Sequence, residues 1–242
     1  RRDYLLIPPI RGLPLQGLVS FHTFSHEVLM LRANNRLNQL PSRIMKRFID
    51  LLVAGLLIIT LWPVMLIIFL CVRSDGGVSI YWHERVGHKS KSFMCPKFRS
   101  MVPNADAVLT DIIGANEKLS LEWKNHQKLS NDPRVTRIGN FLRSTSLDEL
   151  PQLFSIIRGH MSLVGPRPIT KDELLKYGDQ TDYYTQVLPG LTGLWQVSGR
   201  SGTGYSTRIA LDVWYVKNWS IWTDVVILLK TVSVVLSRKG AL

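Results

Sequence analysis

The chain has 242 residues, of which 45% are hydrophobic, and it carries a formal net charge of +12 at pH 7. This composition excludes an intrinsically disordered chain and allows one sizeable domain with attached segments. The basic excess predicts an anionic partner: nucleic acid, an anionic membrane surface or a phosphorylated substrate. Cys71 and Cys95 have no metal-ligand spacing, which favours a reducing compartment and gives neither thiol a role.

The N-terminal segment is predicted to be a tether. It opens RRDYLLIPPIRGLPLQG without an initiator Met, so we expect the chain to be the C-terminal part of a longer protein. Prolines recur through residues 1–41 and surround one short helical candidate, residues 25–40. We therefore assign residues 1–41 to a tether that follows an upstream region.

Residues 51–72, LLVAGLLIITLWPVMLIIFLCV, contain no charge, and their length matches the ~20 residues that cross a bilayer. The default interpretation is a transmembrane helix with a kink at Pro63. Cationic residues flank both ends, however, and such flanks favour the cytoplasmic side. Both flanks satisfy that rule if the chain turns back at Trp62 and Pro63, as a re-entrant helical hairpin over residues 42–73. The backbone groups freed at the bend would need a partner such as Thr60.

A β-hairpin is predicted after the membrane segment. Residues 79–85 and 93–98 are rich in β-branched and aromatic side chains and flank a Gly-His-Lys-Ser turn. Lys97 and Arg99 occupy alternate positions on the second strand, so both side chains are expected on one face. They are either solvated strand charges or a clamp for phosphate.

An amphipathic surface helix without chemistry of its own is predicted over residues 104–127. His83, His88 and His126 lack the spacing of a zinc site, so we expect them to be structural. The histidines therefore predict no metal centre.

Two adjacent carboxylates, Asp148 and Glu149, stand directly before an apolar run. One interpretation is structural: Ser146 and Glu149 match a capping box, and Asp148 could itself be the N-cap. Pro151 separates these alternatives, because its missing N–H is tolerated in the first turn of a helix and costs a hydrogen bond further in. The other interpretation is chemical, since adjacent ionised carboxylates favour a divalent cation such as Mg²⁺.

Cations surround the acid pair in the sequence. Arg143 precedes it, and Arg167 stands between Pro166 and Pro168, which fix φ on both sides of the arginine. A guanidinium on so stiff a turn loses little entropy when it binds phosphate. Arginine, lysine and a carboxylate pair with a metal are the components of phosphoryl transfer.

Two C-terminal segments complete the pattern. Residues 188–205 are glycine-rich and contain Gln196 and Arg200, but they lack the ending of a Walker A loop, so a nucleotide-binding loop is one alternative there. Residues 214–242 combine clustered tryptophans with an apolar stretch that ends in cations. They form either a core helix or, as we predict, an interfacial helix on a membrane.

These stretches resemble the monotopic bacterial sugar transferases, which are polyprenyl-phosphate phosphoglycosyl transferases. The motifs that carry the resemblance follow the family's order: KRFIDLLVAGLL, PKFRSM, LRSTSLDELPQLFSIIRGHMSLVGPRP and PGLTGLWQVSGR. The resemblance covers Lys46 to the C-terminus, and the leader and the ending are similar to longer members that act in O-antigen or capsule assembly. One departure is Trp62 before Pro63, where some members have serine.

The predicted elements and the resemblance together give a mainly α chain with a small β-hairpin (α+β). The resemblance implies a monotopic enzyme of the bacterial inner membrane, with interfacial amphipathic helices and a cytoplasmic catalytic domain over residues 74–213. The implied reaction moves a hexose-1-phosphate, galactose first and glucose next, from a UDP-sugar to undecaprenyl phosphate and releases UMP.

The resemblance also implies the roles of individual residues. Asp148 is the implied nucleophile, and Glu149 helps it to hold Mg²⁺. The implied phosphate contacts are Lys97, Arg99, Arg143 and Arg167, and the expected nucleotide contacts are Pro166, Pro168, Gln196 and Arg200.

Two other functions compete with this one. A glycosyltransferase that moves the sugar alone and releases UDP would need an Asp-x-Asp metal site in an α/β nucleotide fold, and the chain has neither pattern. A basic membrane-anchored module that binds nucleic acid or anionic lipid would spread its cations as a stripe with aromatic residues, whereas here they cluster beside one acid pair. We therefore expect the lipid bilayer and the two substrates as partners and no nucleic acid, and a homodimer is left open.

Overall fold

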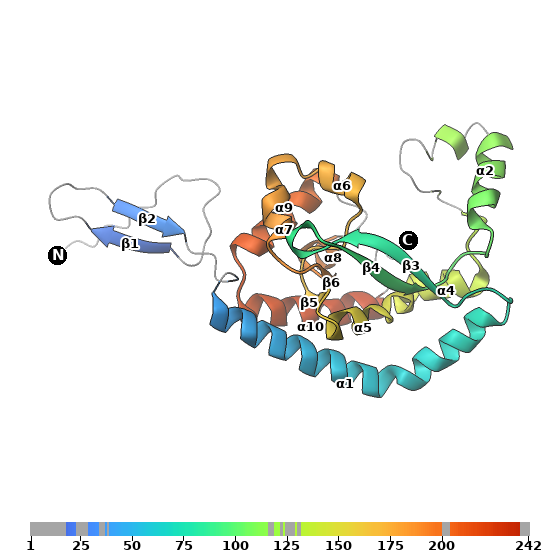
Figure 1. Ribbon diagram of the computed structural model, residues 1–242, viewed down its shortest axis with the longest axis horizontal. Coiled ribbons are helices and arrows are strands. Elements are labelled where there is room, and N and C mark those ends of the chain that lie inside the picture. The colour runs from blue at the N-terminus through green and yellow to red at the C-terminus, as the bar shows by residue number, and fades with distance from the viewer. Residues whose placement is uncertain are drawn as a thin grey trace.

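The computed structural model describes residues 18–22, 29–33, 37, 39–115, 119–121, 123, 129, 132–199 and 204–237. Helices dominate this part of the chain, and its strands form two-stranded sheets only. Figure 1 shows the helices and the hairpin β3–β4 gathered above one long helix, α1. The predicted fold class, mainly α with a small β-hairpin, is confirmed.

The N-terminal region contains a hairpin where a helix was predicted. Strands β1 (Leu18–His22) and β2 (Leu29–Ala33) pair antiparallel, and the first long helix begins only at Leu40. The predicted helix over residues 25–40 is therefore wrong. Short apolar runs such as Leu29–Ala33 carry no period that separates strand from helix.

Helix α1 spans Leu40–Arg73 without interruption and has Pro41 in its first turn, where a missing N–H costs nothing. The expected break at Trp62–Pro63 is a bend within this continuous helix, because Pro63 removes only one hydrogen bond while the rest of the ladder holds. Figure 1 shows the helix bowed, with both ends bent toward the helices and the hairpin that lie above it. Thr60 donates to the carbonyls of Leu56 and Leu57, so it satisfies a different turn from the one that Pro63 frees.

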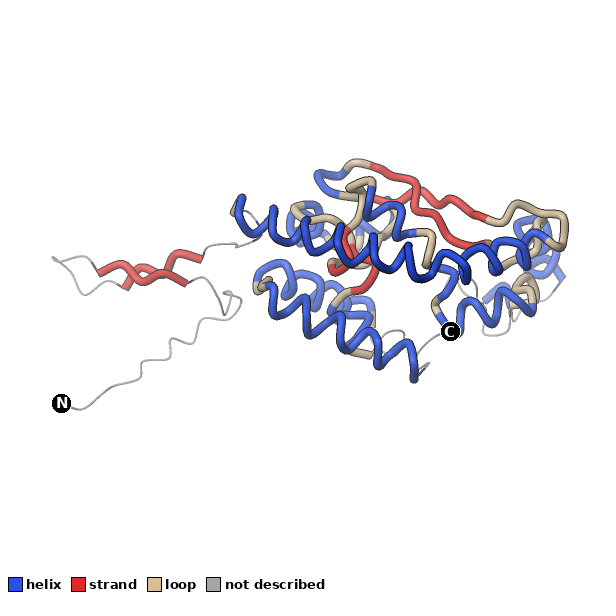
Figure 2. Tube along the Cα trace, turned by 90° about the horizontal axis from the view of Figure 1, so that it is seen from below, coloured by secondary structure: helices blue, strands red, loops and turns tan. Residues whose placement is uncertain are grey.

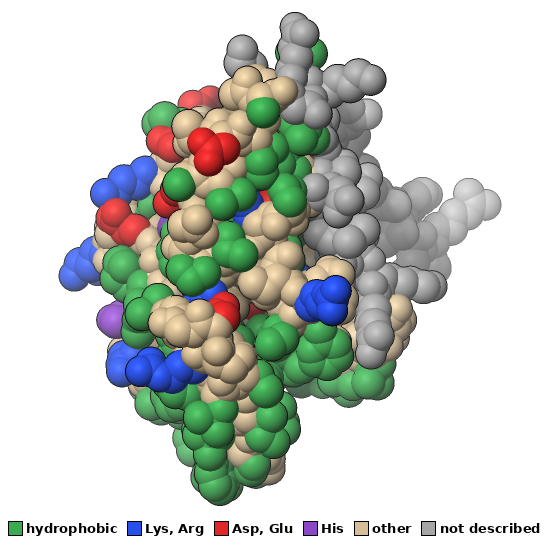
Figure 3. All heavy atoms as spheres, turned by 90° about the vertical axis from the view of Figure 1, so that its right-hand side faces the viewer, with side chains coloured by type: hydrophobic (Ala, Val, Ile, Leu, Met, Phe, Trp, Pro, Cys, Tyr) green, Lys and Arg blue, Asp and Glu red, His purple; other side chains and the backbone are tan. Residues whose placement is uncertain are grey.

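One side of α1 packs on the body of the molecule and the other is open. Arg47 donates to Ile156 O at 2.7 Å, and Asp50 accepts a hydrogen bond from Leu163 N at 3.0 Å. Only 17% of the apolar 18-residue window is buried. Figure 3 shows hydrophobic side chains covering the ridge at the bottom of the molecule, where α1 lies. By length and composition α1 is the one helix among the described residues that could cross a membrane, which is compatible with monotopic association.

The predicted hairpin follows α1 within a residue of its expected bounds. Strand β3 (Ile80–Val86) pairs antiparallel with β4 (Ser92–Phe98), and the 3-10 turn η2 (His88–Ser90) connects them. Helix α2 (Ala105–Ala115) forms the first part of the predicted surface helix. The rest of that helix is described only at a few positions, and His126 lies outside the described residues.

The remaining chain folds as short helices around one small parallel sheet. Strands β5 (Ser162–Val164) and β6 (Gly190–Thr192) pair in parallel. The helices and 3-10 turns around them are α4 (Arg137–Thr145), η3 (Leu147–Glu149), α5 (Gln152–Ile157), α6 (Lys171–Leu175), η4 (Gly178–Gln180), α7 (Thr181–Thr185) and α8 (Leu194–Val197). Ile156 of α5 and Val164 of β5 lie in a buried core that also includes Met161 and Val216.

The C-terminal segment contains two helices, so the single helix predicted from residue 214 is corrected. Trp214 belongs to α9 (Tyr205–Lys217), and α10 (Ile221–Ser237) begins after a break. Ile227 is buried in the core, whereas Trp222, Leu229 and Leu236 project outward at helical spacing. Figure 2, the view from below, shows α10 beside α1, and an ion pair of 2.6 Å between Lys46 and Asp224 joins them.

Candidate active site

The acid pair lies on a 3-10 turn between two helices. Ser146 ends α4 in the left-handed region at φ 58°, and Asp148 and Glu149 follow in η3. Neither η3 nor α5 has a side-chain cap at its start, so the predicted capping box is absent. Pro151 stands at the start of α5 with φ −60°, where its missing N–H is tolerated. Capping therefore does not explain why two acids stand here.

Lys97 and Arg167 supply positive charge to this pair. Lys97 Nζ lies 2.6 Å from Glu149 Oε1 and 3.8 Å from Asp148 Oδ2. Arg167 Nη2 lies 3.7 Å from the same Glu149 oxygen. Burial raises the pKa of Asp148, the charge of Lys97 opposes that rise, and the charge of Glu149 adds to it. The structure thus brings Lys97 to both acids and Arg167 to Glu149, and their binding of phosphate stays a prediction.

A pocket that opens to solvent lies beside the acid pair and is lined by Glu149. Its lining contains five residues that the sequence singled out: Lys97, Glu149, Arg167, Pro168 and Gln196. It also contains residues that the sequence reading missed: Arg85, Cys95, Gln152 and Leu191. Arg85 was recognisable, because it alternates with Tyr81 and His83 on β3, and Tyr81 pairs with Lys97. Burial raises the pKa of the Cys95 thiol to about 11, so this thiol is protonated at neutral pH.

Arg99 does not reach the acid pair. Its guanidinium, 8% exposed, forms an ion pair with Asp75 and donates to the carbonyls of Val72, Val78 and Met101. All five guanidinium N–H groups can be used by these partners, which leaves none for a phosphate. Strand alternation predicted that the side chains of Arg99 and Lys97 lie on one face of the strand. Because β4 ends at Phe98, the alternation does not extend to Arg99.

The other predicted site residues fall into different settings. Arg143 donates from Nε to Ser100 Oγ at 2.9 Å, and its charge interacts with that of Asp148. Pro166 is fully buried, and its carbonyl accepts a hydrogen bond from Gly190 N, so it supports the turn and does not line the pocket. Arg200 lies outside the described residues.

Comparison with known proteins places this arrangement in a family. The family described as bacterial sugar transferase matches residues 41–238. The chain belongs to this family. Its match covers α1, the hairpin β3–β4, the acid pair and α10, which are the elements that build the pocket and the apolar ridge.

Relatives of this bacterial sugar transferase span two lengths. It is 50% identical to the undecaprenyl-phosphate galactose phosphotransferase of Salmonella typhimurium and 51% identical to the UDP-galactose-lipid carrier transferase of Erwinia amylovora, each over 99% of this chain and 50% of the relative. The chain therefore spans about half the length of these curated relatives. It is 48% identical to the exopolysaccharide production protein ExoY of Rhizobium meliloti, over 81% of this chain and 87% of the relative.

The glycines of the transferase's GPRP and PGLTG stretches serve backbone packing. A Cβ atom at Gly190 would overlap Gly165 N, and one at Gly193 would overlap Gly165 O. Gly165 N donates to Thr192 O, and Gly190 N donates to Pro166 O. These close approaches hold β6 against the Arg167 turn. Close backbone packing at the rim of the pocket therefore explains these glycines. This weakens the alternative that residues 188–205 form a nucleotide-binding loop.

Proposed function

We propose that this transferase moves a hexose-1-phosphate from a UDP-sugar to undecaprenyl phosphate and releases UMP. One observation supports this most: of two adjacent acids without a capping role, both lie within 3.8 Å of Lys97, and Glu149 also pairs with Arg167 in an open pocket. An anionic diphosphate needs the cations, and transfer at phosphorus needs a nucleophile beside them. The relatives named for UDP-galactose and for undecaprenyl phosphate fit the same pair of substrates.

In the first step Asp148 acts as the nucleophile. One of its carboxylate oxygens attacks the sugar-bearing phosphorus of the donor, and the bond from that phosphorus to the bridging oxygen breaks. The bridging oxygen keeps the electron pair and leaves as part of UMP, so the phosphosugar stays esterified to Asp148. The pKa of Asp148, raised by burial, reflects a poorly solvated carboxylate, and removing water from an anion increases its nucleophilicity.

In the second step the lipid phosphate takes over the phosphosugar. An oxygen of undecaprenyl phosphate attacks the same phosphorus, the bond to Asp148 breaks, and the carboxylate is regenerated. Two displacements at one site require the cations twice, because a phosphate group leaves in the first step and another enters in the second. Lys97 lies within 3.8 Å of both acids, so it is placed to stay with the phosphorus through both steps.

Asp148 and Glu149 are also the proposed ligands of Mg²⁺. No group of three His, Cys, Asp or Glu side chains forms a metal site among the described residues. Two carboxylates nevertheless fit this ion, because Mg²⁺ is commonly bound by one or two carboxylates together with water and substrate phosphates. When bound, the ion would neutralise phosphate charge.

The apolar ridge of α1 suggests where the lipid substrate arrives. We assign the protein to the bacterial inner membrane, with α1 in the bilayer and the body that carries the acid pair on the cytoplasmic side. Both ends of α1 carry cations, Arg43 and Lys46 before its apolar part and Arg73 at its end, as a cytoplasmic location of both ends requires. The outward side chains of α10 would rest on the same membrane surface.

Galactose is the proposed sugar, because two relatives at 50–51% identity carry galactose in their names. Glucose is second: a relative from Escherichia coli, named UDP-glucose:undecaprenyl-phosphate glucose-1-phosphate transferase, is 37% identical over 79% of this chain. O-antigen or capsule assembly is the proposed pathway, and it rests on the resemblance of the leader and the ending to longer members of the family.

The experiment that tests this function identifies the nucleotide product. Detergent-solubilised protein is given UDP-galactose, Mg²⁺ and undecaprenyl phosphate, and the nucleotides are separated. We expect UMP, and release of UDP would instead identify a glycosyltransferase that moves the sugar alone. Without the lipid, labelled UMP should still exchange into UDP-galactose, because the first step is reversible and needs no acceptor. Absence of this exchange in a preparation that turns over would contradict the covalent intermediate.

A further inference from the structure

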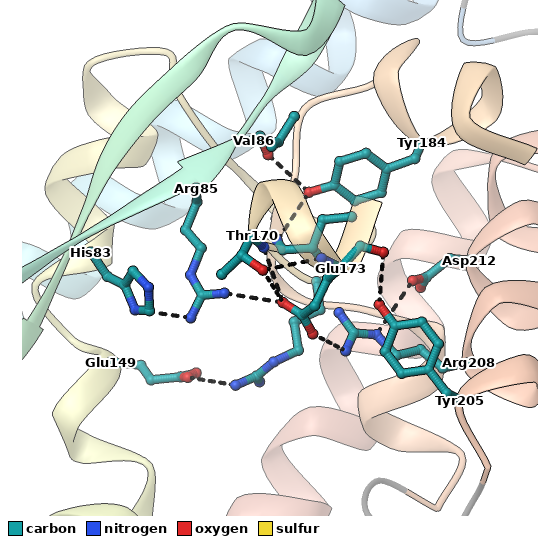
Figure 4. A network of polar contacts seen from close by, with 12 residues as sticks. His83, Arg85, Val86, Glu149, Thr170, Glu173, Tyr184, Tyr205, Arg208 and Asp212 are labelled. Atoms are coloured by element: carbon teal, nitrogen blue, oxygen red, sulfur yellow. Dashed lines mark hydrogen bonds and ion pairs between the residues drawn. The ribbon is translucent and has the colours of Figure 1, made fainter. Parts of the chain in front are cut away.

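A second cluster of charges lies beside the acid pocket, and its centre is Glu173 on α6 (Figure 4). Glu173 Oε2 lies 3.2 Å from Arg85 Nη1, and Glu173 Oε1 lies 3.3 Å from Arg208 Nη1. Arg85 comes from β3 and Arg208 from α9. One carboxylate thus joins two arginines from distant parts of the chain.

Arg85 connects this cluster to the pocket. Its side chain lines the pocket together with Lys97, Glu149 and Arg167. Nη1 is bonded to Glu173, and Nη2 donates to His83 Nδ1 at 3.1 Å. A guanidinium has five N–H donors, and these two bonds use two of them. Within the described part of the chain no other acceptor bonds Arg85, so it keeps donors for an anion in the pocket.

Glu173 is itself held from two other directions. Arg208 is 8% exposed and sits between the rings of Trp195 and Tyr205, with its guanidinium carbon 4.9 and 5.2 Å from their centroids. Thr170 and Glu173 form a reciprocal capping box at the start of α6. The carboxylate therefore has little freedom, and an arginine bonded to it is oriented in turn.

The positive charges around Glu173 are a second reason for a carboxylate at this position. Burial alone would raise the pKa of Glu173, but the hydrogen bond from Thr170 N–H and the charges of Arg208, Arg85 and Arg167 hold it below its usual value. Arg85 and Arg167 also repel each other, since the charge of Arg167 lowers the pKa of Arg85. Two like charges at one pocket need a fixed counter-charge when no anion is bound.

We propose that Glu173 is a positioning residue that holds Arg85 in the pocket as a further cation for the phosphate groups of the donor. The inference rests on the proposed function and adds Arg85 to the cations that bind the UDP-sugar. Glu173 does not touch the donor. It fixes the direction of the arginine, so its loss should weaken binding of the donor more than it slows the chemical steps.

The test is the rate of UMP release at varied UDP-galactose by the full chain, with undecaprenyl phosphate held constant. Glu173→Gln keeps a side chain that can complete the capping box and removes the charge. We expect it to raise KM for UDP-galactose about tenfold, the size of one lost charge-assisted hydrogen bond, and to change kcat less than about threefold. Arg85→Ala should raise KM at least as much, and the double variant no further than Arg85→Ala alone.

Thr170→Ala is the matched control, because it removes only the hydroxyl of the cap, while the bond from Thr170 N–H to Glu173 Oε2 and both ion pairs of Glu173 remain. It should lower the unfolding temperature and leave KM within about twofold of wild type. If Thr170→Ala raises KM as much as Glu173→Gln, or if the Glu173 and Arg85 effects add, the positioning role is wrong. Should Glu173→Gln fail to fold, Glu173→Asp keeps the charge on a shorter side chain and should raise KM by a smaller factor. If wild type releases no UMP, the proposed function fails, whatever Glu173 does.

Discussion

Lys97 and Arg99 stand two residues apart and end in different regions of the molecule. Lys97 lies at the solvent-open pocket and is shared between Asp148 and Glu149. Arg99 is buried against Asp75 and three backbone carbonyls. Both are cations with acidic partners, so charge pairing alone does not distinguish them. The difference is that the partners of Arg99 complete its hydrogen bonding, whereas Lys97 serves two acids at a surface that a substrate can reach.

The largest effect on the rate is expected for Asp148→Asn, which removes the proposed nucleophile beside the solvent-open pocket. UMP release should fall by a factor of ~1000 or more, as for the loss of other catalytic nucleophiles. Burial raises the pKa of Asp148, so its ionised form is less favoured in the folded state than in the unfolded state. The variant should therefore unfold at the same temperature as wild type or higher. Turnover that survives the substitution would refute the covalent mechanism.

Lys97→Met removes the shared ammonium and keeps much of the apolar stem. We expect UMP release to fall by a factor of ~100, the size seen when one preorganised charge-stabilising donor is lost. The unfolding temperature should change little, because Lys97 is 26% exposed and its ion pairs are partly solvated. Lys91→Met, an exposed position on the same hairpin, is the control and should leave the rate unchanged.

The fold could be predicted where local patterns decide it. The β3–β4 hairpin came from β-branched residues around a turn, and its bounds are right within one residue. Leu29–Ala33 was mistaken for helix, because its strand is defined by pairing with Leu18–His22 and not by its own period. The course of α1 at Pro63 was also beyond the sequence, since one lost hydrogen bond permits either a bend or a turn.

The site could be predicted where neighbours in sequence are neighbours in space. The acid pair and the Arg167 turn were found in this way, and the structure joins them to Lys97. Glu173 was missed, because 88 residues separate it from Arg85 and it belongs to no recognisable motif, whereas the alternation of Arg85 on β3 could have been used and was not. Arg99 was misplaced, because alternation predicts a direction only while the strand continues.

Asp212 tests what burial alone does to a charged group, away from the solvent-open pocket at which Lys97 lies. Burial raises its pKa to about 6, even though Tyr177 donates a hydrogen bond to it and Arg208 lies nearby. The unfolded value is near 3.8, so between these values the folded state binds more protons than the unfolded state. Stability should fall by about 3 kcal/mol as pH rises from about 4 to about 6, and Asp212→Asn should lose this dependence.

The measurement for Asp212 is denaturant unfolding from pH 4 to 7.5, compared between wild type and Asp212→Asn. Subtracting the two curves removes the other titrating groups, which both proteins share. A constant difference between wild type and Asp212→Asn would show that Asp212 titrates alike in both states and would contradict a raised pKa in the folded protein.

The smallest of these effects should come from Arg99→Met, and it sharpens the contrast with Lys97. The substitution leaves the carbonyls of Val72, Val78 and Met101 without this donor, while Asp75, 41% exposed, can be hydrated. We expect a loss of about 2 kcal/mol in the free energy of unfolding. KM for the donor should stay unchanged, because no N–H group of Arg99 is left for a phosphate. If Arg99→Met instead raised KM at unchanged stability, Arg99 would belong with the phosphate-binding cations, and completed hydrogen bonding would not separate the two regions.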